Sequence, residues 1–556
     1  MRQLAGVFCL TALLSGLSGC SSVPFLGDDE PTVPLGTVGH VKGFFGGVAG
    51  DEPQAVLAAR DALTAGGTAA DAAATLYFVL SVTMPSAAGL GGGGLCLVRD
   101  PNGYRVETLD FLGQPSSGPG KRVMVPGNAR GMFALHAKYG KFKWREIVRP
   151  AENLARFGAR VSRALAAELQ RAEAVLAGAS EGATPFRGDG GRVVAEGGRV
   201  VQVDLAATLA QIRSRGGAIF HMSDSGRRFA EAIQRAGYGM TYRDLNAATP
   251  IWRSAIRVPF TDEASLYFPM PRTPAGTLAA KMTAMLVEEG SFKDVGVNER
   301  AHLAAEAGQR AMADGANGFR EVSRVREVIQ PRRPQHKETV VHPELTDDYA
   351  ERLMTGYKPD RLTELAARGQ SSHIAGRPGG STSFAVVDNT GGAVACALTM
   401  NSAFGLGRTV PGTGVFLAPY PDDLAGRDLS LAAVIADRDF GNSLYMVGAA
   451  AGSPASQAVL AQIGLTVGLV PGAVADQEVA SRTRVYRDLV AKVTYVENGA
   501  SGGLTGALKQ RGHRLISVPE LARVNLAFCP NGLPTERSLC RITTDPRGLG
   551  YATVSD

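Results

Sequence analysis

The chain has 556 residues, of which 45% are hydrophobic and 20% charged, and its formal net charge is +6. This length allows a large buried core and about two to four domains. The 69 glycines follow no collagen-like period, and no Lys/Arg cluster with interleaved aromatic residues occurs. The composition therefore excludes a fibrous repeat and gives no sign of a nucleic-acid groove.

The N-terminus has the pattern of a bacterial secretory signal. Arg2 gives a short positive region, an apolar run extends from Leu4 to Leu14, and Leu17-Ser18-Gly19-Cys20 follows. An apolar stretch this short, ending in small residues, predicts a signal peptide over residues 1–20 and not a membrane span. The last four residues also match a lipoprotein signal, which predicts lipidation of Cys20. The alternative is an ordinary signal peptide with an incidental cysteine.

The lipoprotein interpretation predicts a protein of the bacterial cell envelope, lipid-anchored on the periplasmic side. Ser21 after the lipidated position resembles outer-membrane sorting. Residues 21 to about 35 are rich in Pro and Asp and predict a tether. No later run reaches about 18 uninterrupted apolar residues, so the remainder is predicted to be soluble.

Four cysteines remain besides Cys20 and Cys9 of the signal. Cys529 and Cys540 flank a Pro-Asn-Gly turn and are predicted to form a disulfide in an oxidising compartment. Cys96 and Cys396 lie in apolar strand-like runs, and we expect them to be small core residues. No Cys/His set has zinc spacing, so no metal site is predicted.

The first half of the chain is predicted to be mainly helical. A helix is expected from Ala55 to Leu80, broken at Gly66-Gly67, and a run of glycines from Gly89 to Gly94 precedes a strand at Leu95–Val98. A phosphate-binding loop is disfavoured there, because no Lys-Ser/Thr follows and a strand stands in place of a helix. Residues 130–330 carry amphipathic stretches that favour helices.

The second half has a different pattern. Residues 320–345 are charged and contain several prolines, which predicts a mobile linker. Strands are expected at Phe384–Val387 and Ala393–Leu398, with a hairpin turn at residues 388–392 between them. A helix-rich front and a strand-rich back fit a layered α/β architecture.

Several segments match, in the same order, motifs of one enzyme family. The matching segments are residues 65–73, 85–94, 109–111, 125–127, 139–141, 381–388, 399–414, 448–453 and 545–547. Each is weak alone, but their shared order over about residues 40–553 identifies the chain as a member of the gamma-glutamyltransferase family. The resemblance implies an α/β N-terminal-nucleophile hydrolase fold, a four-layer αββα sandwich with two stacked, mainly antiparallel sheets.

The resemblance also implies three parts of the chain. These are the signal peptide 1–20, a large-subunit-like region 21–380 with a flexible linker at about 320–380, and a small-subunit-like region 381–556. In the family the precursor cuts its own chain and the two pieces stay associated. No organic cofactor or metal is implied.

The nucleophile position of the family falls on Ser381. Cutting in front of this residue would free an α-amino group, which titrates near about 8 and can serve as the general base for the hydroxyl. Thr382 is the alternative if the cut is shifted by one residue, and Ser381 could also simply lie in the Gly-rich turn. Thr399 and Asn401 match residues that support the nucleophile and the substrate.

Four further positions match the family's substrate and oxyanion sites. Asp423 is the position that would hold the substrate α-ammonium, and Ser430 is one of two hydroxyls that would hold the α-carboxylate. Ala451 and Gly452 match the pair whose backbone N–H groups bind the oxyanion.

The same pocket departs from the family pattern at several positions. Ala451 replaces the first glycine of the oxyanion pair, and Tyr420 and Pro421 alter the wall near Asp423. Leu112 stands where the family has the Arg that grips the substrate α-carboxylate, Leu431 replaces the second hydroxyl, and Ser383 replaces a His. Losing a charge-assisted bidentate contact lowers binding by roughly 1.5–3 kcal/mol, about 10- to 150-fold. The changes lie on the carboxylate side and indicate a changed substrate or lost activity.

Three functions remain open from the sequence. The first is an amidase or acyltransferase that uses Ser381 on a γ-glutamyl-like or other acyl group without a free α-carboxylate, such as a peptide or polymer amide. The second is a catalytically inactive envelope binding protein or scaffold. The third is ordinary glutathione hydrolysis with the carboxylate bound elsewhere. The expected partners are a small-molecule or peptide substrate and, through the lipid, a membrane, but not nucleic acid.

Overall fold

The structure is a computed structural model. It describes residues 44–100, 105–177, 184–188, 191–272, 276–288, 292–315, 317–328, 336–366, 379–420, 430–438, 443–469, 478–534 and 540–555, with side chains of 322–328 and 336–340 excepted.

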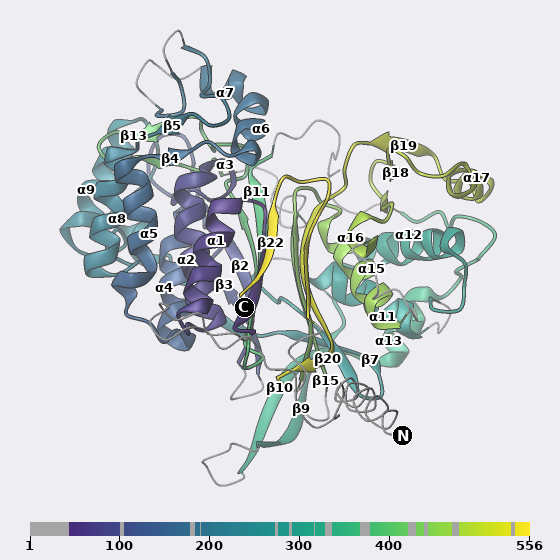
Figure 1. The fold of residues 1–556 in the computed structure, drawn as a ribbon. Helices are drawn as coiled ribbons and strands as arrows, with labels where there is room; N and C mark the ends of the chain where they lie inside the picture. The colour runs from purple at the N-terminus through teal and green to yellow at the C-terminus, as the bar shows by residue number, and fades with distance from the viewer. Residues whose placement is uncertain are drawn as a thin grey trace, which may run out of the picture. The chain divides into compact units, whose positions relative to one another are not determined.

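Two antiparallel sheets form the centre of the molecule (Figure 1). The first has seven strands in the order β22 (Tyr551–Ser555), β1 (Gly46–Gly50), β11 (Ser381–Asp388), β12 (Ala393–Thr399), β2 (Gly93–Arg99), β3 (Val106–Asp110) and β6 (Ile251–Ser254). The second has six, in the order β21 (Arg541–Thr544), β20 (Arg523–Leu533), β16 (Ser443–Ala451), β15 (Leu431–Arg438), β8 (Ala264–Phe268) and β7 (Ile256–Thr261). The sheets therefore mix strands from both halves of the sequence.

Helices cover the outer face of each sheet (Figure 1). Those beside the first sheet are α1 (Pro53–Thr64), α2 (Ala69–Thr83), α3 (Pro85–Ala88), α4 (Asn128–Tyr139), α5 (Trp144–Phe157), α6 (Arg163–Arg171), α7 (Glu173–Ala177), α8 (Val203–Arg215), α9 (Ser223–Arg235) and α10 (Tyr242–Ala247). Those beside the second are α11 (Thr277–Glu288), α12 (Val297–Asp314), α13 (Asp347–Met354), α15 (Ser456–Leu469), α16 (Glu478–Ser481) and α17 (Gly502–Gln510).

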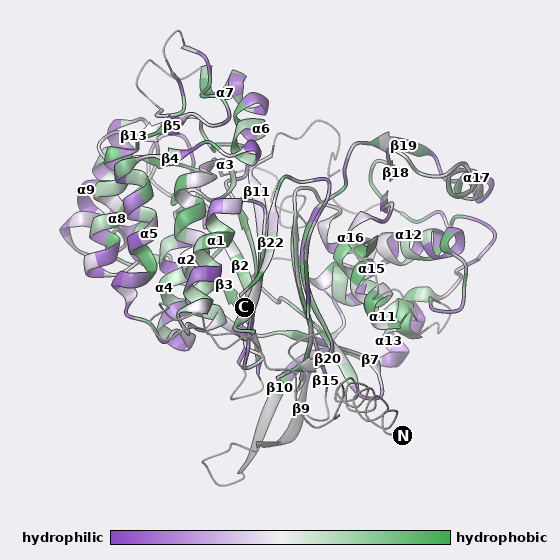
Figure 2. Ribbon diagram, viewed as in Figure 1, coloured by the Kyte–Doolittle hydropathy of each residue, from purple (hydrophilic) through white to green (hydrophobic). Residues whose placement is uncertain are grey.

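The predicted break in the first helix is confirmed. Helix α1 ends at Thr64, and α2 begins after Thr68, whose hydroxyl accepts from the Asp71 backbone N–H while the Asp71 carboxylate accepts from the Thr68 N–H. This reciprocal cap fixes the start of α2. Every residue of α2 is buried, because its many alanines let other elements approach it closely. Figure 2 shows the green, apolar character of this helix.

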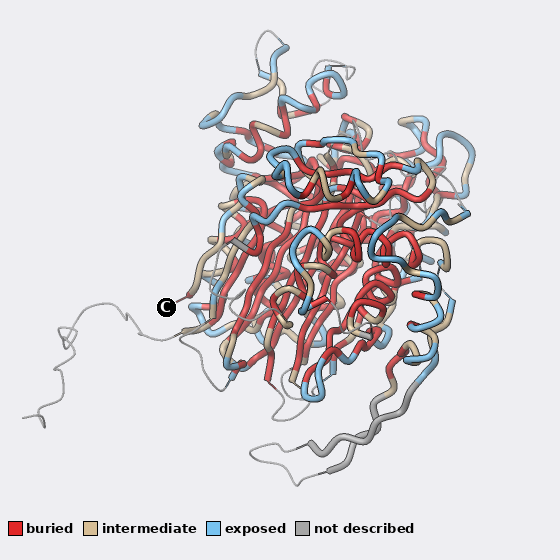
Figure 3. Tube along the Cα trace, turned by 90° about the vertical axis from the view of Figure 1, so that its right-hand side faces the viewer, coloured by how far each residue is buried: buried red, intermediate tan, exposed pale blue. Residues whose placement is uncertain are grey.

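Apolar side chains fill the space between the two sheets as well as the space under the helices. On β11, Phe384 and Val386 pack toward the helices, whereas Ala385 and Val387 belong to the cluster that the two sheets share. This two-residue alternation is what a strand covered on both faces requires. Figure 3 shows the buried strands, in red, through the middle of the molecule.

Smaller sheets complete the described structure. They are the pairs β4 (Ala159–Arg160) with β5 (Arg199–Val200), β9 (Phe319–Val328) with β10 (His336–Leu345) and β13 (Thr409–Val410) with β14 (Val415–Phe416), and the three strands β17 (Val485–Asp488), β18 (Val493–Glu497) and β19 (Leu515–Val518).

The structure corrects three predictions. Residues 320–345, expected to be a mobile linker, include nearly all of the long antiparallel pair β9–β10, which begins at Phe319. Residues 251–268, counted in the helical region, contain β6, β7 and β8. Cys96 and Cys396, expected to be separate core residues, form a disulfide, because they lie directly opposite each other on β2 and β12. Cys529 and Cys540 form the disulfide expected of them.

Within the described residues no helix is both long enough and apolar enough to cross a membrane.

Candidate active site

Ser381 opens β11 and lies directly opposite Thr399, the last residue of β12. The hydroxyl of Ser381 donates to the Thr399 hydroxyl at 3.1 Å. The predicted strands and hairpin turn are present, because β11 ends at Asp388 and β12 begins at Ala393. The hairpin therefore places the two hydroxyl residues side by side at its open end.

Two hydrogen-bond donors hold the carbonyl group of the peptide bond before Ser381. The Gly380 carbonyl oxygen accepts from the Met400 backbone N–H at 2.7 Å and from the Thr399 hydroxyl at 3.2 Å. Gly380 has φ +119°, and a Cβ there would stand 2.4 Å from the Ser402 carbonyl carbon. Only glycine fits this conformation, so the turn and the two donors fix the orientation of the carbonyl.

Asn401 continues the same arrangement. Its backbone N–H donates to the Thr399 hydroxyl at 2.9 Å, and its side-chain amide donates to the Pro419 carbonyl at 2.9 Å. Its φ of +60° lies in the left-handed region, which asparagine tolerates better than most residues. The structure thus brings Ser381, Thr399 and Asn401 together, as the sequence predicts for a supported nucleophile.

A buried polar network lies behind the next two residues of β11. The Thr382 hydroxyl donates to Asp51 Oδ2 at 2.7 Å, and the Ser383 N–H donates to the same atom at 3.3 Å. Asn525 Nδ2 contacts Asp51 Oδ1 at 3.0 Å, the Ser383 carbonyl at 2.9 Å and the Ser383 hydroxyl at 3.0 Å. The hydroxyl of Thr382, the alternative nucleophile, is therefore buried and hydrogen-bonded to the Asp51 carboxylate.

Asp51 and Asn525 were not found from the sequence. Asp51 follows β1 and Asn525 lies on β20, far from Ser381 along the chain. Nothing local marks an Asp after a glycine-rich strand or an Asn in an apolar strand as part of a site. Only the pairing of β1 with β11 and the packing of β20 against β11 bring them together.

The second sheet supplies the candidate oxyanion residues. Ala451 ends β16 and is opposite Leu431 on one side and Arg523 on the other. Gly452 follows with φ +123°, a conformation that favours glycine. Ser430 is buried just before β15. The order across the sheet is therefore Leu431, the oxyanion candidate Ala451, then Arg523.

Leu112 lies on the β15 side of the site. The register of β2 and β3 places it beyond Gly93, which is opposite Thr399, so Leu112 is about three strand spacings, roughly 14 Å, from Ser381. Leu112 and Leu431 belong to the same buried apolar cluster between the sheets. The two leucines that the sequence analysis expects in place of polar family residues thus lie in one apolar region.

A guanidinium lies behind Leu112 that the sequence analysis missed. Arg272 donates through Nη2 to the Leu112 carbonyl at 3.2 Å and through Nε to Asp110 Oδ2 at 3.0 Å. Asp110 is fully buried and also accepts from the Arg272 backbone N–H at 2.9 Å. The ion pair with Asp110 therefore holds the Arg272 guanidinium in place at the end of β3.

Two predicted site residues, Asp423 and Cys20, lie outside the described residues. Among the residues that the structure describes, no group of three or more His, Cys, Asp or Glu side chains could hold a metal ion.

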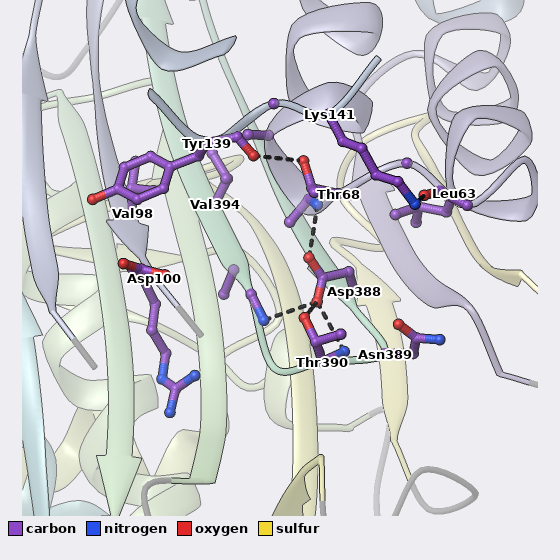
Figure 4. Close-up of a pocket in the computed structure, with 18 of the residues that line it drawn as sticks. Leu63, Thr68, Val98, Asp100, Tyr139, Lys141, Asp388, Asn389, Thr390 and Val394 are labelled. Carbon is purple, nitrogen blue, oxygen red and sulfur yellow. Dashed lines mark hydrogen bonds between the residues drawn. The ribbon is translucent and has the colours of Figure 1, made fainter. Parts of the chain in front are cut away.

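A cavity of about 580 Å³ lies at the other end of β11 (Figure 4). Seven residues of extended strand, roughly 24 Å, separate its wall residue Asp388 from Ser381. Asp388 accepts from the Ala69 N–H at 2.9 Å, so a carboxylate of the chain already caps helix α2 there. This cavity is separate from the Ser381 site.

The chain resembles known proteins in both sequence and structure. The model of the gamma-glutamyltranspeptidase family matches residues 55–433. A glutathione hydrolase proenzyme of Pseudomonas aeruginosa is 27% identical over 69% of this chain and 68% of its own length. The Acylase ACY 1 proenzyme of a Pseudomonas species is 27% identical over 90% of this chain and 93% of its own length.

Among solved structures, cephalosporin acylase from Bacillus halodurans has the same fold. The TM-score is 0.70 at 20% identity, and the match covers 95% of this chain and 99% of the acylase.

Proposed function

We propose that this chain, which belongs to the gamma-glutamyltranspeptidase family, is an amidase or acyltransferase that uses Ser381 as an N-terminal nucleophile after cutting its own chain. Its curated relatives are glutathione hydrolases and acylases, several of them named as proenzymes. Both groups of names describe enzymes that act on amide bonds, which supports a hydrolase or transferase of this family. The position of the cut and the nucleophile are our proposal.

The observation that carries the proposal is the geometry around the Gly380 carbonyl. Ser381 Oγ, the attacking atom, is bonded to Thr399 Oγ1 at 3.1 Å, and Thr399 is also bonded to the Gly380 oxygen at 3.2 Å. The Met400 N–H, 2.7 Å from that oxygen, would stabilise the negative charge that develops on it. These three hydrogen bonds around the Gly380–Ser381 peptide support an attack of the Ser381 hydroxyl on the preceding carbonyl carbon.

The chemistry of the cut balances with water alone. Ser381 Oγ forms a bond to the Gly380 carbonyl carbon, the bond from that carbon to the Ser381 nitrogen breaks, and the hydroxyl proton passes to the nitrogen. Water then hydrolyses the ester, which releases the Gly380 carboxylate and restores the hydroxyl. The product is a Ser381 with both a free hydroxyl and a free α-amine.

That α-amine supplies the general base that the hydroxyl needs. It takes the hydroxyl proton as Oγ attacks the substrate amide carbonyl, and it returns the proton to the departing amine. Backbone N–H groups at Ala451–Gly452 would hold the oxyanion. Water, or an amine, then takes the acyl group from Ser381.

The apolar cluster that contains Leu112 and Leu431 supports an acyl group without a free α-carboxylate. A carboxylate next to two buried leucines loses its hydration without gaining donors, which is unfavourable by several kcal/mol in order of magnitude. We propose that the acyl donor is a γ-glutamyl-like amide within a peptide or polymer. Asp423 would hold its α-ammonium, and Ser430 would contact the acyl chain.

The proposal extends to the architecture and location. The helix–sheet–sheet–helix packing supports the four-layer αββα sandwich of N-terminal-nucleophile hydrolases, with residues 21–380 and 381–556 as the two product chains. Cys20 would carry a lipid that anchors the protein to the periplasmic side of the envelope.

Intact mass and a reducing denaturing gel test the proposal. Reduction is needed because the Cys96–Cys396 disulfide joins segments on either side of the cut. We expect the wild type to give a fragment with the mass of residues 381–556, the Ser381→Ala variant to stay intact, and the Thr382→Ala variant still to be cut before Ser381. A wild type that stays intact after prolonged incubation would overturn the catalytic proposal in favour of a binding protein.

A further inference from the structure

Arg523 opens β20 and points into the same inter-sheet space as the nucleophile. Asn525, two residues along the strand and hence on the same face, bonds Ser383 on β11. Arg523 is opposite Ala451, the candidate oxyanion residue, at the end of β16. Its side chain is 19% exposed. A partly buried guanidinium therefore borders the reaction site on the side away from Leu431.

The donors of Arg523 are only partly used. Its Nε and Nη2 contact the two carboxylate oxygens of Glu520 at 3.2 and 2.9 Å. Its Nη1 is 3.6 Å from Glu168 Oε1, which is an ion pair but too long for a hydrogen bond. Among the described residues, Nη1 donates no hydrogen bond. A guanidinium has five N–H donors in a planar fork, so Arg523 keeps donors for a ligand.

The charges around Arg523 keep it protonated. Burial lowers the pKa of its guanidinium, but the carboxylates of Glu520, Asp51 and Glu168 raise it above the ordinary value. The guanidinium is therefore a cation at neutral pH.

Glu168 on α6 adds a second unfilled contact. Its side chain is 6% exposed, and it pairs with Arg171 at 3.0 Å through Oε1. Its other oxygen, Oε2, is buried and has no hydrogen-bond partner. A Cβ on Gly379 would lie 2.7 Å from that oxygen. Glu168 therefore lies against the segment just before Ser381, and a buried carboxylate oxygen without a donor indicates a missing partner.

The two sides of the site differ in polarity. Leu112 and Leu431 form an apolar wall on the β15 side. Arg523, Glu168 and Asp51 provide charge on the β20 side. Ala451–Gly452, which would hold the reacting carbonyl, lies between them. The acyl chain and the amine of an amide lie on opposite sides of its carbonyl carbon, so an acyl group at the leucines directs the amine toward Arg523.

We propose that Arg523 is the residue that binds a free carboxylate on the leaving amine or acceptor at this site. The inference rests on the proposed function for the orientation of the substrate. The buried Glu168 Oε2, which has no hydrogen-bond partner, accepts from an N–H of the same ligand. A charge-assisted contact of this kind contributes about 10- to 150-fold in affinity.

Binding of two small probes tests the proposal without requiring catalysis. Glycylglycine and glycylglycinamide differ only in the carboxylate, and calorimetry gives the affinity of each for the wild-type protein. We expect the acid to bind about 10- to 150-fold more tightly than the amide, and Arg523→Gln to remove that preference. Arg523→Lys keeps the charge without the fork and should retain part of it.

Arg541→Gln is the matched control, because Arg541 is an exposed arginine of β21, opposite Phe528 and away from the site. It should leave the preference for the acid unchanged. Where the wild type turns over substrate, two γ-glutamyl donors with an amidated glutamyl α-carboxylate, one ending in glycine and one in glycinamide, should show the same preference in kcat/KM and the same loss in Arg523→Gln.

Equal binding of acid and amide by the wild type would overturn the proposal, as would a preference that survives in Arg523→Gln. Neither result depends on whether the chain cuts itself. A wild type that binds the acid selectively but stays intact would keep this inference and overturn the proposed function. The two failures are therefore distinguishable.

Discussion

The hydroxyl of Thr399 lies 3.1 Å from the hydroxyl of Ser381 and 3.2 Å from the carbonyl oxygen of the peptide bond before it. One side chain thus contacts both the attacking atom of the proposed cut and the oxygen that becomes negative.

Removing this hydroxyl should slow the cut. Thr399→Val keeps the branched shape on β12 but deletes these two contacts and the one that the hydroxyl accepts from the Asn401 N–H. Loss of one oxyanion donor typically slows a reaction by about 100- to 1,000-fold. Because the Met400 N–H remains, we expect the lower end of that range. Thr399→Ser should restore most of the rate. Thr390→Val, at the opposite end of the hairpin, is the control. Time courses on reducing gels measure the effect, and equal rates in Thr399→Val and wild type would contradict it.

Leu112→Arg should restore binding of a free α-carboxylate, but at the expense of stability. The new guanidinium could improve affinity for glutathione by up to about 10- to 150-fold. It would also enter a buried apolar cluster near the Arg272 guanidinium, which bonds the Leu112 carbonyl at 3.2 Å. We therefore expect stability to fall by roughly 2–4 kcal/mol.

Adding Leu431→Ser should improve carboxylate binding further, although two groups that serve one carboxylate need not add. Leu112→Met controls for volume. Affinities for glutathione and its α-amidated analogue, with thermal melts, decide the matter. If the wild type already prefers free glutathione and Leu112→Arg changes nothing, the assignment of this wall is wrong.

Acid should destabilise the protein through His513. Burial, followed by the charges of His302, Arg487 and Arg511, lowers the pKa of His513 from 6.5 to about 3. Below pH 6.5 the unfolded chain binds a proton that the folded chain refuses, so stability falls as the pH drops from 6.5 toward 3. At pH 5 the loss is about 2 kcal/mol.

The His513→Gln variant has no such proton to bind. Between pH 7.5 and pH 5 it should lose about 2 kcal/mol less stability than the wild type, measured by denaturant unfolding. Parallel pH profiles for the two proteins would show that His513 is protonated when folded.

Cys20→Ala should release the protein from membranes or block its maturation. The expectation follows from the Leu-Ser-Gly-Cys pattern, since only the cysteine thiol can carry the lipid. Cys9→Ala is the matched control, because that cysteine would leave with the signal. Labelled fatty acid should appear on the wild type and on Cys9→Ala, and its absence from the wild type would remove the lipoprotein hypothesis.

Local patterns predicted the parts of the fold that short-range physics determines. The break between α1 and α2 follows from two glycines and a capping threonine, and the β11–β12 hairpin follows from alternating apolar residues around an Asp-Asn-Thr-Gly-Gly turn. Because Ser381 and Thr399 terminate the same hairpin, their proximity could also be predicted.

The partners of that pair could not be found in the same way. Asp51, Asn525, Arg523 and Glu168 come from four separate elements, and each is an ordinary polar residue within its own segment. Their meeting depends on the long-range packing of two sheets, which no local period encodes. Likewise, the charged residues and prolines of β9 and β10 predict a linker, although β-branched residues lie between them and the two segments pair as strands.

If the chain is cut before Ser381 as proposed, the Cys96–Cys396 bond gives the product a property that a pair of separate chains lacks. Cys96 precedes Ser381 in the sequence and Cys396 follows it, and both sulfurs are fully buried on adjacent strands of one sheet. After the Gly380–Ser381 bond is cut, the disulfide would still join the two pieces. One of its cysteines lies on β12, the strand next to β11, which carries Ser381. Their association is then unimolecular, with an effective concentration that does not fall on dilution. Activity per molecule should be the same at nanomolar and micromolar protein. After unfolding, the two pieces should refold together as one covalently linked molecule as long as the disulfide stays oxidised.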